Sequence, residues 1–137
     1  MRRALLFLAG FAFCAVPVAN GGDDREDAKR TEFFERHIRP ILVAHCYECH
    51  SSAIDEAKGG LKLDFRAGLL KGGESGAAVV PGKPEASLLV EALRFQSLEM
   101  PPAGRLPNSV IADFEKWIRD GAVDPREHPP SVKESAA

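Results

Sequence analysis

Apolar side chains recur at helical spacing in the segment that leads to a pair of cysteines at positions 46 and 49. The repeating positions are Phe33, Phe34, Ile38, Ile41 and Leu42. This period predicts a helix, for which Thr31 is a suitable N-cap. Pro40 lacks the N–H that would bond to the carbonyl of Arg36, so we expect a bent helix or two short segments rather than one straight helix.

Two further helices are predicted nearer the C-terminus. One has Pro84 in its first turn and an apolar face. This face consists of Leu88, Leu89, Ala92 and Leu93. The other is the clearest in the chain, because Asn108 or Ser109 can cap it and Gly121 stops it. Its apolar stripe consists of Val110, Ile111, Phe114, Trp117 and Ile118.

The middle of the chain, between Ser51 and Pro84, is rich in glycine, with doublets at positions 59–60 and 72–73. Glycines interleaved with short apolar clusters indicate mostly ordered loop, with one short helix near Arg66 to Leu70. No convincing strand alternation surrounds the cysteines, so the sequence predicts an all-α fold of short helices.

The two ends of the chain differ from the middle. Residues 1–21 combine two arginines with an apolar run of 15 residues, Ala4 to Val18, which is typical of a secretory signal peptide cut after Gly21. The run is shorter than the ~20 apolar positions of a spanning helix, so we expect export to the periplasm without stable membrane insertion. Residues 22–30 are charged and predict a flexible leader, residues 31–126 a single domain and residues 127–137 a disordered tail.

Charge and composition narrow the class of protein. Loss of residues 1–21 removes two arginines and no acid, so the net charge changes from −2 to −4, and nothing indicates a nucleic-acid partner. The mature domain is small and has few aromatic residues for its core. A large apolar cofactor would complete such a core.

The cysteine pair stands in the motif C-x-x-C-H, formed by Cys46, Cys49 and His50. A disulfide would close too short a loop to stabilise much, and a thiol–disulfide oxidoreductase would need a strand-to-helix setting. Zinc would have only His45 as a fourth neighbouring ligand, without a second ligand pair elsewhere. Covalent haem uses every member: two thioethers to one haem c per chain and an axial imidazole from His50.

The sixth ligand to the iron separates a carrier from an enzyme. Met100 is the only methionine left after signal cleavage, and Pro101 and Pro102 stiffen its loop. We expect it to ligate the iron and to bound an apolar cavity together with His50. His37 and His45 are rivals, and simple loop packing of Met100 is the alternative. An open sixth position would favour a peroxidase or gas sensor.

Three separated blocks resemble the planctomycete-type cytochrome c domain over about residues 31–126. They are "FFERHIRPILVAHCYECH", "GGLKLDFRAGLLKGGESGAAVVPGKPEASLLVEAL" and "LEMPPAGRLPNSVIADFEKWIRDGA". The resemblance implies an exported, cytochrome c-like helical fold around covalent haem, with His50 and Met100 as axial ligands. We therefore expect the chain to be an electron-transfer module and not itself an enzyme. The module would serve an unidentified redox protein or enzyme.

Two features set the chain apart. In the family that it resembles, such a domain usually begins a much longer chain, so we expect either a free-standing carrier or a fragment of such an arrangement. Soluble cytochromes c in general have a proline soon after the motif, which offers its carbonyl to the ligand histidine; here no proline stands between His50 and Pro81, so the group that orients His50 stays open.

Overall fold

The computed structural model describes residues 23–130, so the predicted signal peptide and the end of the predicted tail lie outside the described residues. Within this range the chain is helical, and its bridges are limited to one isolated pair between Gly73 and Gly76. The all-α prediction is therefore confirmed. In the same range, no helix has both the length and the apolar character that crossing a membrane requires.

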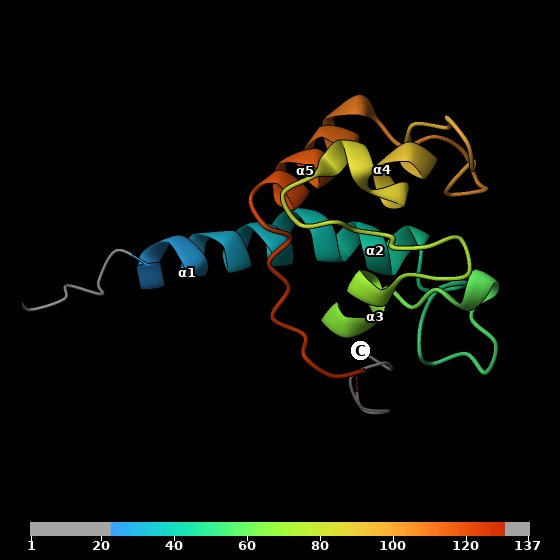
Figure 1. Ribbon diagram of the computed structural model, residues 1–137, viewed down its shortest axis with the longest axis horizontal. Helices are drawn as coiled ribbons and strands as arrows, with labels where there is room; N and C mark the ends of the chain where they lie inside the picture. Colours follow the sequence, from blue (N-terminus) through green and yellow to red (C-terminus); the bar gives the residue numbers. More distant parts are fainter. Residues whose placement is uncertain (1–22, 131–137) are drawn as a thin grey trace, which may run out of the picture.

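The first three elements form one rod. The α-helix α1 (Asp23–Phe33), the π-helical turn η1 (Phe34–Ile38) and the α-helix α2 (Arg39–His45) follow without a break and run across the middle of Figure 1. The N–H of Arg39 bonds to the carbonyl of Phe34, five residues back, directly before Pro40. Pro40 occupies the first turn of α2, where a missing N–H is tolerated. The predicted disturbance at Pro40 is therefore a π turn that continues the helix.

The rod begins earlier than we predicted. Helix α1 starts at Asp23, inside the segment expected to be a flexible leader, and Thr31 lies within the helix instead of capping it. Acidic residues fill the first turn, where they complement the positive end of the helix dipole. Lys29 also bonds to Glu26 one turn away, at 2.7 Å. Since α1 buries no residue and only Phe33 at its end packs against the core, the helical form of residues 23–32 rests on these local charges.

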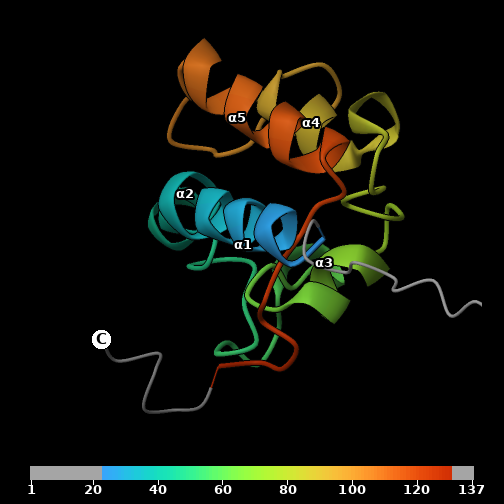
Figure 2. The same cartoon turned by 90° about the vertical axis from the view of Figure 1, so that its left-hand side faces the viewer.

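The other helices lie on opposite sides of the rod. Helices α4 (Leu88–Leu93) and α5 (Asn108–Arg119) pack above it in Figure 1, and α3 (Arg66–Lys71) lies below; Figure 2 shows the same three levels from the side. Helices α3 and α5 stand at the predicted places. Pro84 opens a separate 3-10 turn, η3 (Pro84–Ala86), just before α4, and a second such turn is η2 (Lys58–Gly60).

The core joins α5 to the rod. Trp117 is 2% exposed, and its ring lies 5.7 Å from that of Phe34 in η1 and 6.2 Å, edge-on, from that of Phe114. The indole N–H donates to the carbonyl of Val123 at 2.8 Å. Trp117 therefore packs between α5 and the rod, with its polar atom satisfied.

Residues 123–126, here named the C-terminal arm, leave α5 and cross the rod to the side of α3 (Figures 1 and 2). The N–H of Arg66 donates to the carbonyl of Arg126 at 2.8 Å, which fixes the arm to the start of α3. The arm thus connects the two sides of the molecule.

Candidate functional site

A cavity of about 300 Å³ lies where the end of α2, the glycine-rich middle and the loop after α4 meet. Cys46, Cys49, His50 and Met100 all line it. Most of the remaining wall is apolar and includes Leu61, Leu63, Ala78, Leu89, Leu93 and Pro101. The predicted apolar cavity bounded by His50 and Met100 is therefore confirmed.

The turn after α2 places the two cysteines and the histidine together. The N–H groups of Cys49 and His50 both donate to the carbonyl of Cys46, at 3.1 and 2.9 Å. This winds the backbone tightly enough for three neighbouring side chains to reach one cavity. Both cysteines are free thiols. Burial raises the pKa of the Cys46 thiol to about 11, so this thiol is neutral at physiological pH.

The imidazole of His50 has an unsatisfied polar atom. Its Nδ1 is buried and has no hydrogen-bond partner among the described residues. Burial lowers the pKa of His50, and the main chain of Lys58 and Leu61 opposes this in part. The ring is therefore neutral at physiological pH, which is the form that donates a lone pair to iron. A neutral imidazole that lines an apolar cavity fits an axial ligand of haem.

Met100 reaches the cavity from the loop between α4 and α5. Its N–H donates to the carbonyl of Ala92 at 3.3 Å, and Pro101 after it is buried. The Met100–Pro101 peptide bond is cis. The side chain of Met100 is half-buried, and Leu98, 45% exposed, lies at the edge of the same cavity. The thioether is thus brought to the space that also contains His50.

The structure separates the two rival histidines. His45, next to Cys46, lines the cavity. His37 does not: it lies in η1, stacks on Phe33 with ring centroids 4.6 Å apart, and approaches Asp113 at 3.4 Å. Only one of the two rivals therefore reaches the candidate site.

Glycines bring the walls of the cavity close together. A Cβ on Gly73 would lie 2.3 Å from the carbonyl oxygen of Gly59, and both residues line the cavity. Gly72 has φ of 74°, and its Cβ would lie 2.0 Å from the carbonyl of Gly76. Side chains at positions 72 and 73 would therefore push two cavity-lining loops apart.

Sequence patterns found part of the cavity wall and missed another part. The apolar residues of the glycine-rich middle predict a cavity wall formed by Leu61, Leu63, Leu69 and Val80. Leu61 and Leu63 line the cavity, whereas Leu69 belongs to the core and Val80 is not among the lining residues. Lys58 lines the cavity and was not predicted. The N–H of Lys58 donates to the carbonyl of Cys49 at 2.9 Å, a loop closure that spacing alone does not indicate.

No group of three or more His, Cys, Asp and Glu side chains is placed to hold a bare metal ion within residues 23–130. The zinc alternative, which needs four such ligands, lacks this cluster there. The haem alternative needs only the two thiols, the imidazole and a sixth ligand around an apolar space.

The segment that lines most of the cavity also matches a known protein family. The family model described as Planctomycete cytochrome C matches residues 46–104, which include both cysteines, His50 and Met100. The matched segment is less than half of the chain. No curated protein and no solved structure matches the chain. Residues 46–104 are thus similar to a cytochrome c family.

Proposed function

Starting from the similarity of residues 46–104 to planctomycete cytochrome C, we propose that the chain is an exported c-type cytochrome domain that transfers single electrons. The observation that carries the proposal is the single apolar cavity lined by both cysteines, His50 and Met100. These residue types match the attachment and ligation of one haem c. Most of the cavity wall is apolar, which suits the apolar faces of the haem ring.

Each residue has a defined task in this proposal. Cys46 and Cys49 would attach the group through thioethers, and His50 and Met100 would bind its iron. When bound, haem supplies reversible one-electron chemistry. Leu63, Leu89 and Leu93 keep water from the site, and the thioether of Met100 favours the ferrous state, which suits a carrier. The partner is an unidentified redox protein or enzyme outside the cytoplasm.

A peroxidase or gas sensor is the second candidate. It requires Met100 to leave the sixth position, and the half-exposed loop that carries Met100 and Leu98 is the observation in its favour. The two candidates share the attachment chemistry and differ in access to the iron.

The proposal is tested by expressing the full chain, purifying the processed protein and extracting it with acidified acetone. We expect haem that resists extraction and sharp absorption bands after reduction, because thioether bonds survive acid. A matched chain without residues 1–21 should stay colourless even where haem is plentiful, since attachment takes place outside the cytoplasm. Extractable haem, or no haem in the exported protein, would overturn the proposal.

A further inference from the structure

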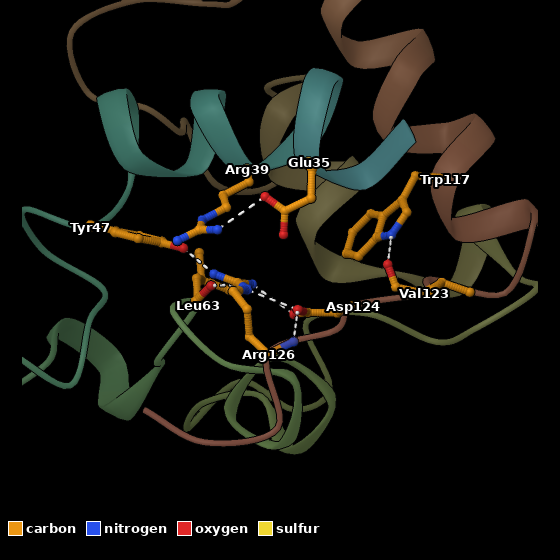
Figure 3. Close-up of polar contacts among 8 residues, drawn as sticks. All are labelled: Glu35, Arg39, Tyr47, Leu63, Trp117, Val123, Asp124 and Arg126. Atoms are coloured by element: carbon orange, nitrogen blue, oxygen red, sulfur yellow. Dashed lines mark hydrogen bonds and ion pairs between the residues drawn. The ribbon is translucent and has the colours of Figure 1, made fainter. Parts of the chain in front are cut away.

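The C-terminal arm binds the loop that carries Cys46 and Cys49. Tyr47 lies between Cys46 and Cys49 in the sequence, and its hydroxyl accepts a hydrogen bond from Nη1 of Arg126, 79 residues further along the chain (Figure 3). Arg126 lies outside the segment that matches the cytochrome family. The contact therefore joins the motif to a part of the chain that the family match does not cover.

Arg126 uses its remaining donors on the same side of the molecule. Its Nε and Nη2 donate to the two carboxylate oxygens of Asp124 at 2.8 and 2.7 Å, and Nη2 also donates to the carbonyl of Leu63 at 3.1 Å (Figure 3). The guanidinium lies 4.8 Å from the ring centre of Phe34. The side chains of Arg126 and Asp124 are only 12% and 1% exposed, so the ion pair is shielded from water.

The charge of Arg126 persists in this setting. Burial disfavours it, but the hydrogen bonds and charges of Asp124 and Tyr47 together outweigh the burial and raise the pKa of Arg126 above its ordinary value. A buried arginine is costly unless its donors are satisfied, and here they are directed at the loop and at Leu63.

Leu63 connects Arg126 to the histidine of the motif. Its carbonyl accepts from Arg126, while its N–H donates to the carbonyl of His50 at 2.9 Å, and its side chain lines the cavity. The next residue, Asp64, accepts from the N–H of Ser52 at 2.8 Å. Arg126 therefore reaches the loop at two points, directly at Tyr47 and through Leu63 at His50.

We propose that Arg126 is a positioning residue, which holds the thiol loop and the His50 backbone in a fixed relation to the cavity wall. The role depends on the planar fork of arginine, because one flat group bonds to Tyr47, Leu63 and Asp124 at once; lysine cannot replace it, since an ammonium group is a point donor. The effect of Arg126 on iron ligation by His50 rests on the proposed function, whereas its effect on the position of the loop does not.

The experiment measures amide hydrogen exchange at Leu63 in the purified exported protein, with Ile118 in the core of α5 as an internal reference. Arg126→Lys should speed exchange at Leu63 relative to Ile118 by about tenfold or more, because charge-assisted hydrogen bonds are lost locally. Arg126→Gln should do the same. Tyr47→Phe removes one acceptor, should give a smaller local effect and remains informative if the arginine variants fold poorly.

Arg36→Gln is the matched control, because it removes the same charge from a mostly exposed pair with Glu32. It should leave both amides unchanged. The electron paramagnetic resonance spectrum of the oxidised protein gives the readout at the iron: Arg126→Lys should add a second low-spin species, and Arg36→Gln should not.

Equal acceleration at Leu63 and Ile118 would mean that Arg126 acts on global stability alone and would overturn the proposal, as would no change at either amide. A single unchanged low-spin species in Arg126→Lys would overturn the positioning of His50. If the exported protein carries no haem, the cytochrome proposal fails, but exchange at Leu63 still decides whether Arg126 holds the loop.

Discussion

Met100 is the residue on which the difference between a carrier and an enzyme depends. Its side chain lines the cavity with His50, and its N–H is tied to Ala92. If the thioether of Met100 binds the iron, the oxidised protein should show a weak far-red absorption band from charge transfer between sulfur and iron. Replacing Met100 with alanine should abolish this band and lower the reduction potential, because a soft thioether ligand is lost. Carbon monoxide should then bind to the reduced iron, which stopped-flow absorption would measure.

Leu98→Ala is the control for Met100→Ala, since Leu98 lies at the same cavity edge two positions earlier. This variant should keep the far-red band, and its reduced iron should not bind carbon monoxide. If the wild-type protein already lacks the band and binds carbon monoxide rapidly, Met100 is not a ligand and the peroxidase or sensor candidate replaces the carrier.

Tyr47 allows the arm contact to be followed by pH titration, because it is the only tyrosine of the chain. Burial raises the pKa of Tyr47 above its ordinary value of 10.0, while the charge of Arg126 opposes the rise. The folded state thus disfavours the phenolate. The stability that this group contributes is fully present below about pH 10 and is lost as the pH rises through the folded pKa.

Nuclear magnetic resonance of protein with ¹³C-labelled tyrosine should therefore show ionisation of Tyr47 at higher pH in the folded than in the denatured state. In Arg126→Gln the pKa of Tyr47 should rise further, because an opposing positive charge is gone. Titration at the ordinary pKa in both proteins would contradict the burial of the hydroxyl.

At the residue scale, the sequence predicted those cavity-lining residues whose pattern is local. Cys46, Cys49 and His50 are recognisable because they lie close together in the sequence, and Met100 because the only other methionine is Met1. Arg126 was not recognisable: its partners Leu63 and Tyr47 lie 63 and 79 residues away, and only the crossing of the arm brings them together. No local pattern encodes a contact of that separation.

At the element scale, the rod divides into a part that carries the core and a part that does not. Phe34 in η1 is fully buried against Trp117, whereas α1 buries no residue. Phe34→Ala should lower the free energy of unfolding by about 3–5 kcal/mol, as expected for a large core truncation. Deleting residues 25–30 should change it by no more than about 0.5 kcal/mol, as for surface changes.

Denaturant unfolding of both proteins would measure these differences. A loss of several kcal/mol on deletion of residues 25–30 would mean that α1 packs on the domain in solution. A small effect of Phe34→Ala would show that the contact between η1 and α5 contributes little to the fold.

The same division explains which elements the sequence could predict. The apolar stripe of α5 carries its own period, and glycine doublets stand on both sides of α3, so both helices were predicted from the sequence. Helix α1 has no apolar period, and ion pairs such as Lys29 with Glu26 sustain it; its charged composition therefore resembled that of a flexible segment. The π turn before Pro40 has no separate pattern and is visible only in the structure.

At the scale of the whole molecule, the cavity and the scaffold occupy different parts of the sequence. Every residue that lines the cavity falls between His45 and Pro102, a span nearly identical to the family-matched segment 46–104. The rod before it and α5 with the arm after it supply much of the core and the outer contacts. The matched segment thus contains every cavity-lining residue except His45, and the flanking elements supply much of the core that surrounds it.

The cavity is lined mostly by apolar residues, so under the proposed function a bound haem would complete the core of this small domain. The double variant Cys46→Ala with Cys49→Ala should therefore be poorly folded after export, with reduced helicity by circular dichroism and a broad, non-cooperative unfolding transition. The wild-type exported protein is the reference. Native-like helicity with cooperative unfolding in the double variant would show that the polypeptide needs no cofactor to close its core.

The crossing of the C-terminal arm also bears on the order in which the domain can close. Arg126 meets Tyr47 across 79 residues of chain, so the loop that carries the thiols gains this restraint only when the end of the domain is in place. If haem is attached as we propose, both sulfurs would be more accessible to an attachment enzyme before the arm docks than after it. Docking of the arm would then complete a domain whose thiols have already reacted.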